Sequence, residues 1–315
     1  LDDAFRGVND IYFQSGSLNT NDQDVRCFRF YSETQNPRTL ELTTSLIQQD
    51  GPFGTNANFD GTNLTFDAGT SRWQFVQNGN INLRESGSLR FHWVEFISGG
   101  GFYNSAQNER IYADSIRSGY WTFFGSRINI GYAELAPTQV HQIQTGDTLT
   151  IDTLVIPGTC DAGPAELRSN TDDQTAYIRA TRDNVLQNLI VKDVHSIGSG
   201  TLSNQNGVDL GNTDGWVFTN REPRTLYWVG GEGDWEDTAH WSRSSGGPGG
   251  ECIPTPVDDV IFDANSFTAP NQQVNASIGV ESFCHDMTWE GGTQTPSLRV
   301  WSLNCFGSIE LIDDM

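Results

Sequence analysis

Three aspartates that lie close together in the sequence have the chemistry to bind a metal ion. Asp258, Asp259 and Asp263 share one turn–strand segment, and Asp234 and Asp237 lie in a glycine-rich loop before it. Calcium takes about six to eight oxygen ligands, many of them carboxylates. We therefore predict calcium as the one cofactor to test, with Asp258, Asp259 and Asp263 as its ligands. No EF-hand spacing occurs, however, and an acidic turn exposed to water has the same composition.

Carboxylates also serve polysaccharide hydrolysis, because cleavage of a glycosidic bond needs a pair of them. Asn212-Thr213-Asp214 resembles the signature of β-helical polygalacturonases, and Asp172-Asp173 or Asp258-Asp259 would supply the further acids. The Gly-His-Gly and Arg-Ile-Lys companions of that signature do not follow, and a tight turn uses the same residues. The histidines lack the H-E-x-x-H spacing of zinc enzymes, and the sequence has no nucleophile elbow or phosphate loop. We therefore predict that the chain is not an enzyme.

The chain has five cysteines and no C-x-x-C pair, which disfavours zinc-ribbon and thioredoxin chemistry. In a secreted protein some cysteines form disulfides. Cys252 and Cys284 flank the segment 257–267, and closing their 32-residue loop is worth about 3–4 kcal/mol. We predict this disulfide, although the internal repeat described below places Asp3, and no cysteine, at the position of Cys252.

The composition excludes several partners. Acidic residues number 40 against 18 basic ones, the net charge is −22, and Lys192 is the only lysine. Phosphate binding needs a basic footprint, so we predict no nucleic-acid partner. No apolar stretch approaches the roughly 18 residues of a membrane helix, so we also predict no membrane span. An acidic surface of this kind repels anionic polymers and attracts cations.

Short alternating segments must position these residues. Apolar and polar residues alternate over 88–96, 127–135, 148–156 and 186–194, with turns rich in Asn, Gly and Thr between them. Period-2 alternation is the signal of a strand with one buried face, and no segment has a sustained helical stripe. We predict an all-β fold in which residues 40–220 form a right-handed parallel β-helix. A β-sandwich is the alternative that the same pattern allows.

The two ends of the chain resemble each other. Residues 8–18 (VNDIYFQSGSL) match residues 257–267 (VDDVIFDANSF) at an offset of 249, and Cys27 matches Cys284 at an offset of 257. Two matches in the same order indicate a repeat of about 250 residues that stacks in one dimension. We predict that residues 1–50 end a preceding junction module and that 51–225 form the β-helix body. Residues 226–315 then form a smaller Trp/Gly-rich β module that leads into the next repeat.

The most distinctive sequence motifs lie within residues 208–267. In chain order they are DLGNTDGW, YWVGGEGDW, HWS, SGG, CIPT and DDVIFD. This segment resembles repeats of very large secreted surface proteins of gliding Bacteroidota, and the likeness is looser over the rest of the chain. The resemblance implies export to the cell surface by type IX secretion and an adhesive or filamentous role in gliding motility. It implies no catalytic residues.

Two interpretations fit the three tryptophans of this segment, Trp228, Trp235 and Trp241. An exposed row of aromatic rings would stack on sugars, so we name all three as candidate glycan contacts. A buried cluster would instead seal the end of a β-helix or a repeat junction. Tryptophan suits both roles, because it combines a large apolar area with an N–H donor.

These observations together predict a structural repeat segment of a giant extracellular adhesin or filament that mediates attachment at the cell surface. The expected partners are copies of the chain in a homo-oligomeric filament, packed through lateral aromatic contacts, neighbouring repeats of the same chain, and cell-surface glycans. Two alternatives from other classes stay open, namely a carbohydrate-active β-helix enzyme and a passive glycan-binding module.

Overall fold

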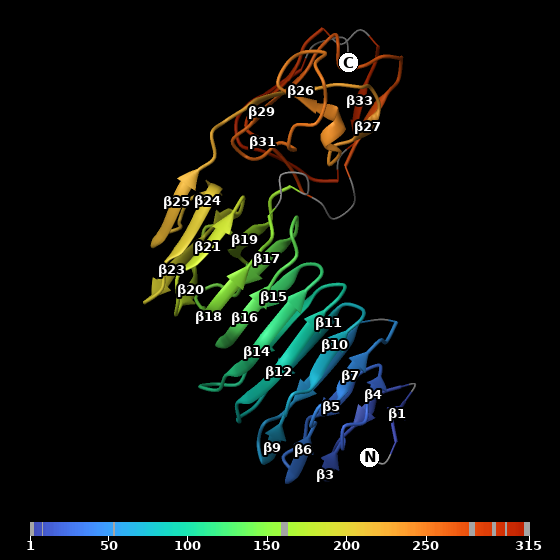
Figure 1. Ribbon diagram of the computed structural model, residues 1–315, viewed down its shortest axis with the longest axis vertical. Helices are drawn as coiled ribbons and strands as arrows, with labels where there is room; N and C mark the ends of the chain where they lie inside the picture. The colour runs from blue at the N-terminus through green and yellow to red at the C-terminus, as the bar shows by residue number, and fades with distance from the viewer. Residues whose placement is uncertain are drawn as a thin grey trace.

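The chain coils into a long solenoid that carries a smaller β unit at its C-terminal end (Figure 1). The computed structural model describes residues 3–311 except 8, 53, 159–162, 277–280, 292–293 and 300. Within these residues the strands pair in parallel, apart from one short antiparallel pair in the C-terminal unit. The predicted all-β parallel β-helix is therefore confirmed, and the β-sandwich alternative is excluded.

Three parallel sheets form the walls of the solenoid. The ten-stranded sheet comprises β1 (Phe5–Arg6), β4 (Val25–Cys27), β7 (Leu46–Gln49), β10 (Arg72–Phe75), β12 (Leu89–Phe96), β14 (Ile111–Ser118), β16 (Ile128–Glu134), β18 (Thr148–Val155), β20 (Ala176–Ala180) and β23 (Val194–Gly198). The twelve-stranded sheet comprises β2 (Ile11–Tyr12), β5 (Phe30–Ser32), β8 (Thr55–Phe59), β11 (Gly79–Leu83), β13 (Gly100–Asn104), β15 (Thr122–Phe124), β17 (Val140–Ile143), β19 (Glu166–Ser169), β22 (Ile190–Lys192), β24 (Leu202–Asp209), β21 (Asn184–Gln187) and β25 (Trp216–Asn220). The three-stranded sheet of the first turns comprises β3 (Gly16–Asn19), β6 (Arg38–Glu41) and β9 (Leu64–Asp67).

The core lies inside the solenoid because apolar and polar residues alternate along each strand. In β14, Ile111 and Ala113 are buried, whereas Tyr112 between them is only half-buried. In-register pairing places Ile111 on Ile128 and Ala113 on Ile130 of the next turn. Apolar ladders of this kind bury area worth roughly 25 cal/mol per Å². The period-2 pattern of the sequence thus sets which residues fill the interior.

Aromatic rings fill much of this interior. The ring of Trp73 meets those of Phe30, Phe59 and Phe91 at centroid distances of 5.6–5.9 Å, in edge-to-face arrangements. Such contacts add about 0.5–1.5 kcal/mol per pair beyond the buried area. Many of the aromatic residues that suggested lateral contacts between copies are therefore internal to the solenoid.

The C-terminal unit, residues 224–311, has a separate hydrophobic core. Its five-stranded sheet comprises β28 (Trp241–Ser242), β26 (Thr225–Trp228), β29 (Asp259–Phe262), β32 (Met287–Trp289) and β35 (Ile309–Glu310). Two smaller sheets comprise β27 (Gly233–Asp234), β30 (Gln273–Asn275) and β33 (Ser297–Arg299), and β31 (Ser282–Cys284) and β34 (Leu303–Cys305). The antiparallel pair is β26 with β28, and the 3-10 helix η1 (Thr238–His240) leads into β28. We call residues 224–249 the Trp–Gly segment.

The C-terminal unit repeats the topology of the first turns of the solenoid. β29, β32 and β35 pair in succession as β2, β5 and β8 do. Likewise β30 pairs with β33 as β3 does with β6, and β31 pairs with β34 as β4 does with β7. Strand pairing places Ile11 at the position that Val260 has in the C-terminal unit. It places Leu18 at the position of Val274, whereas the sequence match aligns Leu18 with Phe267. The repeat is thus present in the fold, with extra residues between β29 and β30.

The two units meet on the outer face of the twelve-stranded sheet. Phe283 packs against Ile190 and Val208, and Arg168 lies 3.9 Å from Glu281. Near residue 50, strands β7 and β8 belong to sheets that continue both before and after them. The solenoid is therefore unbroken in this part of the chain. None of the described helical residues forms a helix long and apolar enough to cross a membrane.

Candidate functional site

Polar and aromatic side chains form a ladder on the outer face of the twelve-stranded sheet. In-register pairing aligns Tyr12, Tyr31, Asn58, Asn82 and Tyr103 on successive turns. The rings of Tyr12 and Tyr31 stack at 4.8 Å, and the Asn82 amide donates a hydrogen bond of 2.6 Å to the Asn58 side-chain oxygen. Rings offer an apolar face, and amides offer both donors and acceptors. The ladder therefore suits a ligand that is apolar on one face and polar at its edge.

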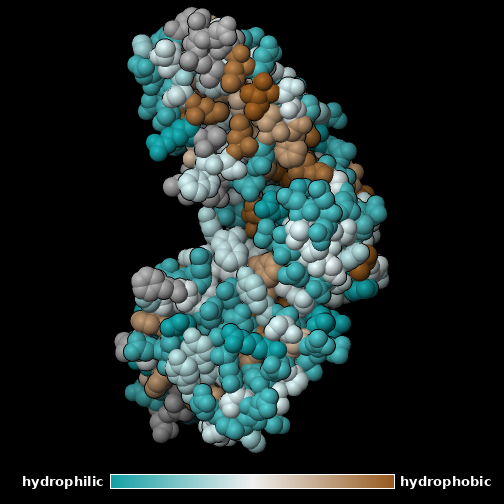
Figure 2. All heavy atoms as spheres, turned by 180° about the vertical axis from the view of Figure 1, so that it is seen from behind, coloured by the Kyte–Doolittle hydropathy of each residue, from teal (hydrophilic) through white to brown (hydrophobic). Residues whose placement is uncertain are grey.

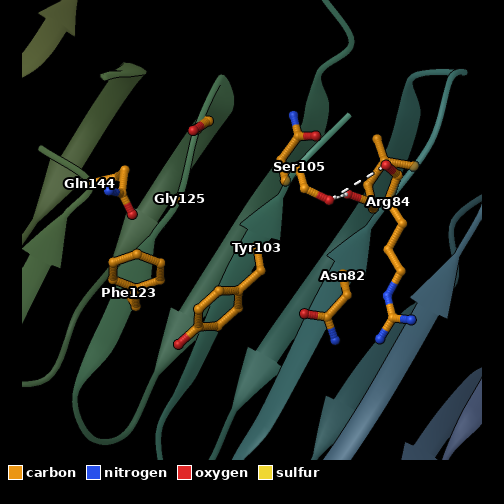
Figure 3. A pocket seen from close by; sticks show the side chains of 10 residues that line it. Asn82, Arg84, Tyr103, Ser105, Phe123, Gly125 and Gln144 are labelled. Carbon is orange, nitrogen blue, oxygen red and sulfur yellow. Dashed lines mark hydrogen bonds between the residues drawn. The ribbon is translucent and has the colours of Figure 1, made fainter. Parts of the chain in front are cut away.

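A pocket of about 180 Å³ opens at the Tyr103 end of this ladder (Figure 3). Tyr103 of β13 and Phe123 of β15 lie side by side, with ring centroids 4.7 Å apart and planes 33° from parallel. Tyr103 is 39% exposed, whereas Phe123 is 8% exposed and supports the Tyr103 ring from the side. Asn82 and Arg84 lie on one side of the rings, and Gln144 lies on the other. The pocket thus combines an aromatic shelf with two amides and a guanidinium.

The electrostatics of this pocket favour a neutral ligand. The Arg84 guanidinium is balanced by Glu33, whose carboxylate lies 2.9 Å away. Burial raises the pKa of Tyr103, so its hydroxyl stays protonated at neutral pH and can both donate and accept. The Ser105 hydroxyl is engaged with the main-chain carbonyl of Leu83. The groups left to a ligand are ring faces, amides and one charge-balanced arginine.

Two glycines keep this region of the sheet open. Gly101 pairs with Phe123, and Gly125 follows the β15 strand beside Tyr103. A Cβ atom at Gly101 would lie 2.4 Å from the Phe123 carbonyl oxygen, and one at Gly125 would lie 2.5 Å from that of Phe102. No larger residue fits either position without moving the backbone, so neither position can fill the space beside the rings.

Sequence reasoning missed this pocket, because its residues come from several strands and share no linear motif. One signal was available. Asn58 and Asn82 are 24 residues apart, which is the length of the turn that joins β8 to β11. Spacings that match one turn of a solenoid bring like residues together on one face.

The three tryptophans named as glycan contacts are buried, and the expectation that they touch a ligand is wrong. Trp228, Trp235 and Trp241 are 0–1% exposed. Their rings surround Phe262 at centroid distances of 6.0–6.4 Å. The indole N–H groups of Trp228 and Trp241 donate to main-chain carbonyls, which satisfies these donors inside the core. The core-cluster interpretation is therefore the correct one.

The three aspartates expected to bind calcium point in different directions. Asp258 is fully buried, and the Arg224 guanidinium donates to it at 2.6 and 2.9 Å. Burial would raise the pKa of Asp258, but the bonds and charge of Arg224 outweigh it and hold this pKa below its ordinary value. Asp259 faces the opposite side, because successive residues of a strand alternate. Asp263 accepts hydrogen bonds within its own turn.

Asp259 instead meets residues from the next turn. Its carboxylate hydrogen-bonds to the His285 ring at 3.0 Å and accepts from the Asp286 main-chain N–H at 3.1 Å. Among the described residues this is the one group of three whose ligand atoms lie within 4.8 Å of one another. The hydrogen bonds account for the arrangement, and Asp258 and Asp263 do not take part in it.

The predicted disulfide between Cys252 and Cys284 is also wrong. Cys284 is a buried free thiol, and Cys27 and Cys305 are free as well. Cys252 does form a disulfide, but with none of these three cysteines. The reason is strand register, which pairs Cys284 of β31 with Cys305 of β34 and directs its side chain along the ladder.

The Asn212-Thr213-Asp214 motif builds a corner of the solenoid. Asp173, Asp193 and Asn212 have φ angles of 53–59°, and each occupies one of three stacked turns. The Asp193 carboxylate accepts from the Asn212 amide at 2.9 Å and from the Asp173 N–H at 3.0 Å. Asn and Asp tolerate the left-handed conformation and bond to nearby backbone. A structural role therefore explains these residues, while the Asp214 side chain extends into solvent.

Comparisons with known proteins add no assignment, since no family model, no curated protein and no solved structure matches the chain. The outer-face pocket is thus judged by its own side chains. These are two adjacent rings, two amides and a guanidinium whose charge a carboxylate balances.

Proposed function

We propose that the chain is a structural repeat segment of a large secreted cell-surface adhesin. The observation that carries this proposal is the recurrence of one topology, in which β29–β35 repeat the arrangement of β2–β8. Each turn of a solenoid contacts only its neighbours, so added repeats extend the molecule in one dimension. An extended rod suits a protein that must make contacts at a distance from the cell.

Two further features support an extracellular location. Cys252 forms a disulfide, and disulfides persist in oxidising compartments outside the cytosol. The net charge of −22 keeps such a rod soluble and discourages unspecific contact with anionic polymers. Both features agree with the cell-surface role that the resemblance to gliding-motility proteins implies.

The outer-face pocket supplies the attachment step in this proposal. A pyranose ring has an apolar face of C–H groups and a rim of hydroxyls. Tyr103 would stack on the face, supported from the side by the Phe123 ring, while Asn82, Arg84 and Gln144 would hydrogen-bond to the hydroxyls. The charge balance at Arg84 directs the choice to neutral sugars. The ligand class proposed is therefore a neutral cell-surface glycan.

Binding of the purified chain to a panel of immobilised neutral polysaccharides tests the attachment step. We expect Tyr103→Ala to weaken retention about tenfold, since it removes the exposed stacking surface. Tyr112→Ala is the matched control, because Tyr112 lies on the outer face of the ten-stranded sheet and should leave retention unchanged. Retention that is equal in the two variants, or absent for the wild type across the panel, would refute the glycan contact.

A further inference from the structure

The exposed large hydrophobic side chains lie mostly at the two ends of the molecule. Of the ten that the structure describes, six belong to the first or last turns, and hydrophobic residues gather at the C-terminal end in Figure 2. These six are Phe5 and Tyr12 at one end and Trp301, Phe306, Ile309 and Leu311 at the other. This distribution favours contacts between ends over contacts along the sides.

Among the residues that the structure describes, the first turn has an unpaired strand edge. β2 pairs with β5 on one side, and the Ile11 and Phe13 N–H groups donate to the Arg29 and Tyr31 carbonyls at 2.9 and 2.8 Å. Main-chain groups alternate in direction along a strand, so the Asp10 and Tyr12 N–H groups point to the free edge. Unpaired edge groups are a template for a further strand.

The corresponding edge of the C-terminal unit is covered. The Trp–Gly segment places β26 on β29, with Leu226 in register with Val260, and β27 on β30, with Gly233 in register with Val274. Under this cover Val260, Phe262 and Val274 are 0–1% exposed. The same chain therefore shows how an edge of this kind is completed.

No described part of the chain covers the equivalent side chains of the first turn in this way. Ile11, Phe13 and Leu18 occupy the positions of Val260, Phe262 and Val274, yet all three are only half-buried. We call these three residues the first-turn surface. Its apolar positions and its hydrogen-bonding edge correspond to those that the Trp–Gly segment covers at β29 and β30. The longer connection between β29 and β30, which the segment also contacts through the Gly231 N–H bond to the Ser266 carbonyl, has no counterpart in the first turn.

We propose that the first-turn surface is the docking site for a second copy of the Trp–Gly segment, so that repeats join end to end. The register of β26 on β29 pairs Tyr227 with Ile261, whose equivalent is Tyr12. The docked copy would thus extend the Tyr12–Tyr31 stack by one tyrosine. Its three tryptophans would close over Phe13 as they close over Phe262.

The two edges also differ in the residue that faces Arg224. The buried partner of Arg224 in the C-terminal unit is Asp258, and the offset of 249 places Asn9 at that position. Asn9 is exposed in the first turn. The end-to-end contact therefore relies on strand pairing and aromatic packing, and it lacks the buried ion pair.

A fusion tests the contact directly. A copy of residues 224–249 placed immediately before Leu1 reproduces the linkage of Gly249 to Gly250, since Gly250 and Leu1 are equivalent at the offset of 249. Hydrogen exchange at the Asp10 and Tyr12 amides should slow at least about tenfold relative to the parent chain. The control fusion carries Trp228→Ser, Trp235→Ser and Trp241→Ser in the added copy. Equal exchange rates in the fusion and its control would overturn the proposal.

Asn9→Asp gives an independent test of register. In the fusion it restores a carboxylate opposite the added Arg224, so the melting temperature should rise. In the parent chain residue 9 is exposed, and the same substitution should leave the melting temperature unchanged. Equal effects in both proteins would refute the register. Neither readout depends on glycan binding, so failure of the attachment experiment leaves this contact standing.

Discussion

Replacing Glu166 with glutamine should stabilise the protein at neutral pH and remove part of its pH dependence. Glu166 begins β19 on the outer face of the twelve-stranded sheet, next to the contact that Phe283 makes with Ile190. Only 4% of Glu166 is exposed. Burial raises the pKa of its carboxyl to about 7, although Arg168, 3.5 Å away, opposes the shift. Glutamine keeps the shape of the side chain and removes its charge.

The magnitude follows from the folded and ordinary pKa values of Glu166. Between its ordinary pKa of 4.5 and the folded pKa of about 7, the folded state holds a proton that the unfolded state has lost. The free energy of unfolding therefore falls as pH rises through this window. At about 1.4 kcal/mol per pH unit, the loss is complete above pH 7 and amounts to about 3 kcal/mol. The free energy of unfolding of Glu166→Gln should thus exceed that of the wild type by about 3 kcal/mol at pH 8.

His141 has the opposite slope over an overlapping range. Burial lowers the pKa of His141 to about 4, although its hydrogen bond to the Ala136 carbonyl opposes the shift. The unfolded state then binds more protons than the folded state between pH 4 and 6.5, so stability rises with pH there. The two contributions nearly cancel in the wild type between pH 4.5 and 6.5. Glu166→Gln should expose the rising slope of His141.

Urea unfolding of both proteins at pH values from 5 to 8 measures these slopes. Glu134→Gln is the matched control, because its carboxylate lies 3.4 Å from Arg117 at a site open to solvent. We expect the control to stay within about 0.5 kcal/mol of the wild type throughout. A difference between Glu166→Gln and the wild type that stays constant from pH 5 to 8 would refute the reasoning.

Four further changes test the interior and the solenoid corner. Asp258→Ala should lower the free energy of unfolding by about 3–5 kcal/mol, because it leaves the buried Arg224 guanidinium without its carboxylate partner. Arg38→Met should cost at least about 3 kcal/mol in the same assay, since this buried guanidinium donates to several main-chain carbonyls. Cys252→Ser should cost about 2–5 kcal/mol, and non-reducing peptide mapping should find Cys284 free. Asp214→Asn should change stability by less than about 0.5 kcal/mol, and assays of released oligosaccharide should detect none with either protein.

The solenoid could be predicted from the sequence because it depends on local periodicity. Alternation over 127–135 and 148–156 marks two strands that the structure pairs in register as β16 and β18. The repeat was visible for the same reason, since residues 8–18 and 257–267 keep the alternation of one strand. The exact alignment of the two copies could not be predicted, because only strand pairing shows that Leu18 corresponds to Val274.

The partners of individual side chains could not be predicted in this way. Two adjacent aspartates look alike in sequence, but strand direction turns Asp258 inward to Arg224 and Asp259 outward to His285. Cys284 faces Cys305 because parallel register aligns them, whereas sequence distance suggested a different pair. Each of these contacts joins residues from different turns of the chain.

Exposure was decided by tertiary structure alone. The tryptophans of the Trp–Gly segment are core residues because this segment folds over Phe262. Tyr103 and Phe123, 20 residues apart, meet because one turn of the solenoid separates them. Glu166 has an outward position on its strand and is buried at the contact between the two units. Local periodicity determines the face of a strand on which a residue lies, whereas its burial depends on what a distant part of the chain places against that face.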